Sequence, residues 1–210
     1  KGEGLGNQFL SHIRQVDAIC QVVRCFDDEN ITHVDGKVDP VADIETIHLE
    51  LVLADLESVT KRLSRVEKLA KTKDKDAIAE LNVLEKIKAA LESGIAVRAL
   101  EFTKEEMAIV KQLFLLTAKP MLYVANVDEA SVSDPKSNPY VQQVAEIAEK
   151  EQAEIIHVCA RAEEEIAELD EEDKAEFLEA LGIKESGLDQ LIRSSYQLLG
   201  LATYFTAGEQ

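Results

Sequence analysis

The feature that most constrains the fold of this chain is a seven-residue repeat of apolar side chains between positions 49 and 70. Its positions are spaced alternately by three and four residues: Leu49, Val52, Leu56, Val59, Leu63, Val66 and Ala70. Such a repeat places one apolar stripe along a helix, and a second helix must cover that stripe. A helix over 43–71 would be about 43 Å long, because each residue adds about 1.5 Å.

The residues that follow can supply the covering helix. The run KTKDKD at 71–76 predicts a turn, and a second helix is predicted from about Ala77 to Ser93. Its returning apolar stripe would consist of Leu81, Leu84, Ile87 and Leu91. Two interpretations stay open here. The pair can project as an antiparallel coiled coil, or it can pack as an ordinary helical subdomain.

The rest of the chain alternates between apolar runs and helical patterns. Buried strands are predicted at 18–26, 120–126 and 153–160. Helices are predicted at 5–14, 104–114, 138–152, 162–181 and 186–199. Alternation of strands and helices implies parallel pairing and an α/β fold. We therefore predict a parallel-sheet domain over 1–42 and 94–210, with an antiparallel helical coiled-coil hairpin inserted over 43–93.

Charge and cysteine content narrow the setting of the protein. The formal net charge of -18 gives no overall attraction for nucleic acid or for an anionic membrane surface. No apolar stretch approaches the ~20 residues of a membrane-spanning helix. The three cysteines, Cys20, Cys25 and Cys159, are odd in number and too few for a disulfide framework. We expect a cytoplasmic protein that has no membrane partner.

A local exception to the acidic charge lies at the turn between the two long predicted helices. Residues 61–75 contain seven basic side chains against only Glu67 and Asp74. These are Lys61, Arg62, Arg65, Lys68, Lys71, Lys73 and Lys75. A basic tip without aromatic residues can bind the phosphates of structured RNA by charge and shape. A solvated helix face explains the same residues equally well, since lysine is common on exposed helices.

The opening KGEGLGN places glycines at Gly2, Gly4 and Gly6. It lacks the Lys and Ser/Thr of the phosphate loop G-x-x-x-x-G-K-[ST], and it does not match G-x-G-x-x-G. From the residues alone, we interpret this stretch as a loop that leads into a helix.

A stronger signal follows the second predicted strand. The string YVANVDE places Asn126, Val127 and Glu129 where open α/β sheets bind their ligands. GTPases of the P-loop class carry N-K-x-D at this place, and the Asp carboxylate accepts two guanine N–H donors. Here Val127 replaces the Lys and Glu129 replaces the Asp. The third predicted strand ends in C-A-R at 159–161, which resembles the S-A-K base-contact loop of the same class.

Together these strings resemble the Obg-like ATPases, specifically the YchF subfamily, over nearly the whole chain. The opening segment is similar to the family's segment after switch II, and FDDENITHVDGKVDP with the helical pair is similar to its loop and coiled-coil insertion. YVANVDE is similar to its N-x-x-E motif, and TYFTAGE to the junction before its TGS domain. The resemblance implies the C-terminal part of a P-loop GTPase-like domain. The P-loop and switches would precede residue 1, and the TGS domain would follow residue 210.

The resemblance implies an ATP-binding, ATP-hydrolysing and ribosome-associated protein. ATP is expected rather than GTP, because N-x-x-E accompanies a preference for ATP in that family. Glu129 is one methylene longer than Asp, so its carboxylate need not lie in the geometry that reads guanine. Asn126 and Val127 are expected to contact or frame the base, and Cys159 and Ala160 to close its other side. Mg²⁺ would accompany ATP through ligands outside this chain, and the 210-residue chain alone would be inactive.

Further roles follow from the same resemblance. Gly2, Gly4 and Gly6 would lie next to switch II and give flexibility near the γ-phosphate. His33 resembles a His of a family loop and would position the attacking water or contact the phosphates. No metal-ligand spacing is visible within the chain, so no metal site is predicted. A competing hypothesis is a non-enzymatic module whose basic tip binds ribosomal RNA or a protein.

Overall fold

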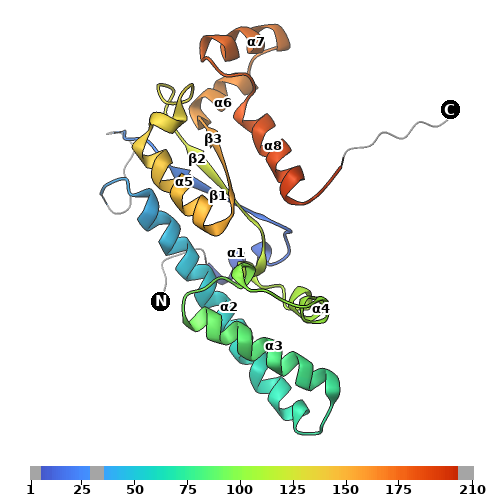
Figure 1. The fold of residues 1–210 in the computed structure, drawn as a ribbon. Helices are drawn as coiled ribbons and strands as arrows, with labels where there is room; N and C mark the ends of the chain where they lie inside the picture. Colours follow the sequence, from blue (N-terminus) through green and yellow to red (C-terminus); the bar gives the residue numbers. More distant parts are fainter. Residues whose placement is uncertain (1–5, 29–35, 203–210) are drawn as a thin grey trace, which may run out of the picture. The chain divides into compact units, whose positions relative to one another are not determined.

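The computed structural model of the protein describes residues 6–28 and 36–202 (Figure 1). The chain divides into two compact units. Unit 1 comprises Lys1–Asp17 and Ile44–Lys119, and unit 2 comprises Ala18–Asp43 and Pro120–Gln210. No described helix is both long enough and apolar enough to cross a membrane.

Unit 2 contains the sheet, which consists of β1 (Ile19–Arg24), β2 (Met121–Asn126) and β3 (Glu154–Val158). The strand order is β1-β2-β3, and both pairings are parallel. This confirms the predicted α/β fold with a parallel sheet. The central strand β2 is buried along residues 121–125, as its uninterrupted apolar sequence predicts.

Two helices of unit 2 cover the sheet: α5 (Pro139–Glu151) and α8 (Gly187–Leu198). Leu122 and Val124 of β2 belong to an apolar cluster that includes Leu191 and Leu198 of α8. Tyr123 points to the other face, since strand side chains alternate, and its hydroxyl donates to Glu151 at the end of α5 at 2.9 Å. The two helices therefore lie on opposite faces of the sheet.

The predicted acidic helix over 162–181 is two helices in the structure. These are α6 (Ala160–Ala167) and α7 (Glu171–Ala180). The break occurs before Asp170, whose carboxylate accepts hydrogen bonds from the backbone N–H groups of Glu172 and Asp173 and so begins a new helix.

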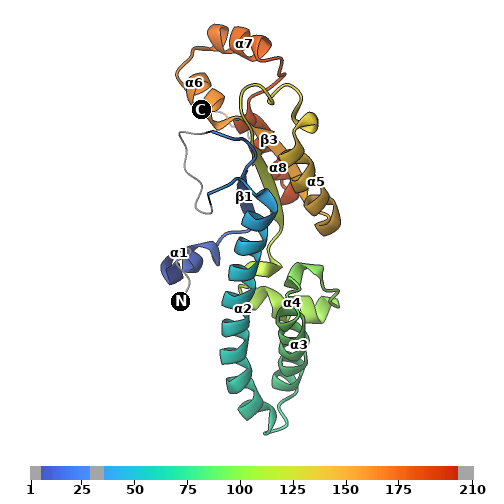
Figure 2. The same ribbon diagram turned by 90° about the vertical axis from the view of Figure 1, so that its left-hand side faces the viewer.

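Unit 1 is built around α3 (Lys75–Glu92) and the part of α2 (Pro40–Ala70) that begins at Ile44. The two helices lie side by side and run in opposite directions in both views (Figures 1 and 2). The turn between them contains Lys73 in the left-handed region, with φ 62°. Of the predicted repeat, Val52, Val59, Leu63 and Val66 are buried, and they cluster with Val83, Leu84, Ile87 and Leu91 of α3. The first position departs from the stripe, since Leu49 is 54% exposed. Coiled-coil packing of the pair stays a prediction.

The boundaries of unit 1 differ from those predicted. The predicted sheet domain includes 94–119, but Val97, Val110 and Leu115 belong to the apolar cluster of α2 and α3. Helix α4 (Lys104–Gln112) supplies Val110, and the 3-10 turns Val97–Ala99 and Leu116–Ala118 flank it. The helical unit is therefore larger than a two-helix insertion over 43–93, and the described residues up to Asp17 belong to it as well.

A buried carboxylate connects these stretches of unit 1. Asp55 of α2 is 0% exposed and accepts hydrogen bonds from the backbone N–H groups of Leu116 at 2.9 Å and Thr117 at 2.7 Å. The Thr117 hydroxyl donates to it at 2.8 Å, and the Arg14 guanidinium at 2.9 Å. Arg14 follows α1 (Gly6–Ile13) in the sequence. Asp55 therefore satisfies groups from two segments that are distant from it in sequence.

Candidate functional site

The carboxyl ends of the three parallel strands lie at one edge of the sheet of unit 2. Arg24 is the register partner of Asn126, which in turn pairs with Val158. The Asn126 side-chain oxygen accepts a hydrogen bond from the backbone N–H of Ala160 at 3.0 Å. The Val127 N–H donates to the Val158 carbonyl at 2.8 Å. The predicted N-V-D-E and C-A-R loops are thus bonded to each other.

The two loops place their predicted residues differently. The Val127 side chain is buried, with 2% exposed, so it supports the loop from beneath. Cys159 is also 2% exposed, and burial raises the pKa of its thiol, which keeps it neutral. Ala160, the first residue of α6, is exposed, and Asn126 is partly exposed. The groups that a ligand can reach at this edge include Asn126 and Ala160.

The acidic residues of the N-V-D-E loop have separate partners. Asp128 accepts a hydrogen bond from the Ser131 backbone N–H at 2.9 Å, which folds the loop back on itself. The Glu129 carboxylate lies 3.2 Å from Nε of Arg161, and both side chains are largely exposed, at 47% and 79%. Arg161 also lies 4.0 Å from Glu165 in the next turn of α6.

A residue that sequence analysis assigned no role at the site, Asn138, ties a third loop to this edge. Its side-chain NH₂ donates to the Cys25 carbonyl after β1 at 2.9 Å and to the Ser131 hydroxyl at 3.3 Å. Its side-chain oxygen caps α5 by accepting from the Tyr140 N–H at 2.9 Å. The Tyr140 hydroxyl donates to the Asp27 carboxylate, with distances of 2.9 and 3.1 Å to its two oxygens. The available signal was the Asn-Pro step, a common helix start.

The start of α8 packs against Val158 at the end of β3 and bonds to α6. The Glu163 carboxylate accepts hydrogen bonds from the backbone N–H groups of Gly187 at 2.6 Å and Leu188 at 3.1 Å. A Cβ atom on Gly187 would lie 2.6 Å from Cγ1 of Val158, so only glycine fits here. Asp189 donates its backbone N–H to the Ser186 hydroxyl at 3.1 Å. These contacts fix the segment that carries 159–161.

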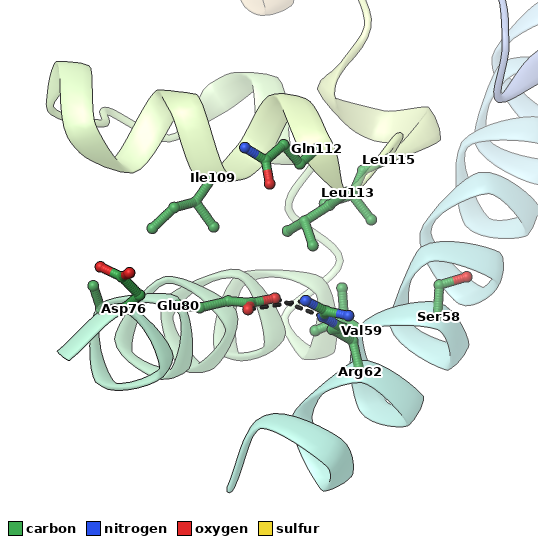
Figure 3. Close-up of a pocket in the computed structure, with 10 residues that line it drawn as sticks. Ser58, Val59, Arg62, Asp76, Glu80, Ile109, Gln112, Leu113 and Leu115 are labelled. Carbon is green, nitrogen blue, oxygen red and sulfur yellow. Dashed lines mark hydrogen bonds and ion pairs between the residues drawn. The ribbon is translucent and has the colours of Figure 1, made fainter. Parts of the chain in front are cut away.

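The basic residues predicted for RNA lie on α2, on the turn and on the start of α3. Lys61 is bonded to Glu57, and Arg62 makes two hydrogen bonds to Glu80, at 2.6 and 3.0 Å (Figure 3). The other five are exposed and make no ion pair with any residue that the structure describes. They are Arg65, Lys68, Lys71, Lys73 and Lys75. Five of the seven predicted basic residues therefore have no ion-pair partner in the described part of the chain, and their contact with RNA stays a prediction.

A cavity of about 520 Å³ lies beside the same helices in unit 1, with Arg62 and Glu80 on its wall (Figure 3). Val59 and Leu115 contribute apolar surface, and Ser58, Asp76 and Gln112 contribute polar groups. Because Arg62 and Glu80 satisfy each other, the cavity presents no free guanidinium to an anion such as a nucleotide phosphate.

The chain is similar over its whole length to two bacterial proteins, both named "Ribosome-binding ATPase YchF". It is 66% identical over 210 residues to that of Bacillus subtilis, and the match covers 100% of this chain and 57% of that protein. It is 53% identical over 208 residues to that of Escherichia coli O157:H7, which covers 99% of this chain and 56% of that protein. This chain belongs to the YchF family.

The fold agrees with this family. "Structure of the Schizosaccharomyces pombe YchF GTPase" matches with a TM-score of 0.87 and 37% sequence identity, over 99% of this chain and 56% of that one. The chain thus spans somewhat more than half the length of its YchF relatives. No protein-family model matches it.

Some residues that the YchF resemblance singled out lie outside the described residues. These are Gly2, Gly4 and His33. Gly6 begins α1 in unit 1, with φ 49°. Within 6–28 and 36–202, no group of three or more His, Cys, Asp and Glu side chains could hold a metal ion. The ligands of the Mg²⁺ that accompanies ATP were predicted to lie outside this chain, and that stays a prediction.

Proposed function

We propose that this chain supplies the base-recognising half of a nucleotide-hydrolysing, ribosome-associated protein of the cytoplasm. The observation that carries the proposal is the hydrogen bond of 3.0 Å between the Asn126 side-chain oxygen and the Ala160 N–H. It joins the two predicted base-contact loops at the carboxyl edge of a parallel sheet, where such folds bind ligands. The names of the bacterial relatives, which describe ribosome-binding ATPases, support the proposal.

We propose ATP rather than GTP as the preferred substrate. Guanine presents N1–H and N2–H₂ donors, which require a free carboxylate. Adenine lacks this pair of donors and offers an N6 amino group, which backbone carbonyls can accept. The ion pair with Arg161 engages Oε1 of Glu129, one of the two carboxylate oxygens that bidentate recognition of guanine would need. Because the S. pombe relative is named a GTPase, the base preference is the point to test.

The test is a calorimetric titration of ATP and GTP, each with Mg²⁺, into the full-length protein and into the 210-residue chain. We expect ATP to bind the full-length protein at least about tenfold more tightly than GTP, which corresponds to ~1.4 kcal/mol. We expect no measurable binding to the 210-residue chain, because the phosphate-binding residues are expected outside it. Tighter binding of GTP would contradict the proposed preference. Binding of neither nucleotide to the full-length protein would contradict the proposed function.

A second candidate function, RNA binding, is favoured by the five unpaired basic residues around the α2–α3 turn. We propose that α2 and α3 form an antiparallel coiled coil whose turn contacts ribosomal RNA. Reversing the charge of Lys68, Lys71 and Lys73 to Glu should weaken binding to purified ribosomes by at least about tenfold. The plot of log K against log[salt] should also become less steep by about 2–3, since each lost phosphate contact removes ~0.9 from the magnitude of its slope.

The matched control for this experiment reverses three exposed lysines elsewhere, Lys104, Lys111 and Lys150, to Glu. It changes the net charge equally but leaves the turn intact. Equal losses in both triple variants would show a general charge effect and would contradict a contact by the turn.

A further inference from the structure

The ion pair between Glu129 and Arg161 joins the same two loops as the Asn126–Ala160 hydrogen bond. We propose that Arg161 is a positioning residue that contributes to base preference, because it holds the Glu129 carboxylate away from guanine. The proposal rests on the proposed function, since it assumes that a purine base binds at this edge of unit 2.

The geometry of the two loops explains why these side chains meet. Asn126 and Ala160 are fixed to each other at 3.0 Å, and the Val127 N–H is fixed to Val158 at 2.8 Å. Glu129 lies three residues after Asn126, and Arg161 lies one residue after Ala160. Each side chain therefore leaves its loop next to the other, and the carboxylate lies 3.2 Å from Nε.

Of the two carboxylates of this loop, Glu129 is the one that does not bond to the loop backbone and can therefore face a base. Asp128, its neighbour, accepts the Ser131 N–H at 2.9 Å and lies in the turn of the loop. Bidentate recognition of guanine by Glu129 would use both carboxylate oxygens and would therefore compete with Arg161 for Oε1. Adenine has no donors that need this carboxylate, so its binding does not break the ion pair.

The exposure of the two side chains limits the size of the effect. Arg161 and Glu129 are 79% and 47% exposed, and exposed ion pairs contribute little because water and salt screen them. Nε of Arg161 also lies 4.0 Å from the Glu165 carboxylate, so Arg161 divides its charge between two acidic partners. We therefore expect Arg161 to adjust the preference between purines rather than to impose it alone.

The test measures ATP, GTP and inosine triphosphate affinities of the full-length protein and its Arg161→Met variant. In the variant, GTP affinity should rise about threefold, or ~0.7 kcal/mol at 1.4 kcal/mol per tenfold. Inosine triphosphate, which keeps the N1–H but lacks the N2 amino group, should gain less, and ATP should stay unchanged. Arg161→Lys, which keeps the cation, should retain most of the wild-type preference.

Two further variants complete the test. Adding Glu129→Gln to Arg161→Met should remove the gain in GTP affinity, since the gain needs a free carboxylate. Arg193→Met breaks another exposed pair of unit 2, in which Arg193 bonds Glu185 at 2.5 Å, and should leave the ratio of GTP to ATP affinity unchanged. The proposal is overturned if Arg161→Met leaves that ratio unchanged, or if the gain persists in the double variant. Failure of the wild type to bind either nucleotide would instead overturn the proposed function.

Discussion

Replacing Asp55 by alanine should lower the free energy of unfolding of the chain by about 3–5 kcal/mol, a loss typical of removing one partner from a buried ion pair. The carboxylate is 0% exposed and accepts hydrogen bonds from two backbone N–H groups, a hydroxyl and Arg14. Without it, the N–H groups of Leu116 and Thr117 would stay buried without an acceptor. Urea unfolding followed by circular dichroism measures the loss.

Two companion variants make this result interpretable. Asp55→Asn keeps the shape and one acceptor oxygen but presents an NH₂ group to donors, so it should fall between wild type and Asp55→Ala. Glu57→Ala removes an exposed carboxylate two positions away on the same helix, whose ion-pair partner among the described residues is Lys61. It should change the free energy of unfolding by no more than about 0.5 kcal/mol. A loss below about 1 kcal/mol for Asp55→Ala would refute the structural role given to this side chain.

Replacing Asn126 by alanine should weaken ATP binding to the full-length protein on the order of 10–100-fold. The variant removes the acceptor of the Ala160 N–H and therefore uncouples the two loops. It also removes an amide that is expected to contact the base. Calorimetric titration with ATP and Mg²⁺ measures the change.

The matched control is Asn82→Ala on the exposed surface of α3, which should leave ATP affinity unchanged. The unfolding transition of Asn126→Ala must remain cooperative, so that lost affinity is not lost folding. ATP affinity equal to wild type in a folded Asn126→Ala protein would rule out this edge of the sheet as the base site.

The sheet and its loops could be predicted from sequence because their signals are local. The buried strand 121–126 is a continuous apolar run, and N-V-D-E follows it directly. The stripe on α2 was equally visible, since a repeat fixes which side chains share a face. The proximity of Asn126 and Ala160 could also be predicted, because each follows or ends a strand and parallel neighbouring strands place their carboxyl ends together.

What could not be predicted depends on contacts between distant segments. Asp55 lies three residues after Val52 and four before Val59, so its spacing placed it on the buried face, but its acceptor role depends on Leu116 and Thr117. The boundary of unit 1 was missed for the same reason, because Val97 and Val110 join the cluster only in three dimensions. The pairing of Arg62 with Glu80 across the helix pair also depends on a segment distant in sequence, and the RNA contact predicted for Arg62 stays a prediction.

The pairing of β1 with β2 sets a delay during synthesis of the chain on the ribosome. Ile19 pairs with Met121, which is made about a hundred residues later. At the usual ~5–20 residues per second, β1 waits about 5–20 s for its neighbour. During that time the pair of α2 and α3 can already form, since α3 ends at Glu92, well before β2 begins at Met121. The helices then shorten the free chain that must be closed before the strands meet. Mutations that loosen the helical cluster should therefore prolong the exposure of β1 and favour aggregation of the nascent chain.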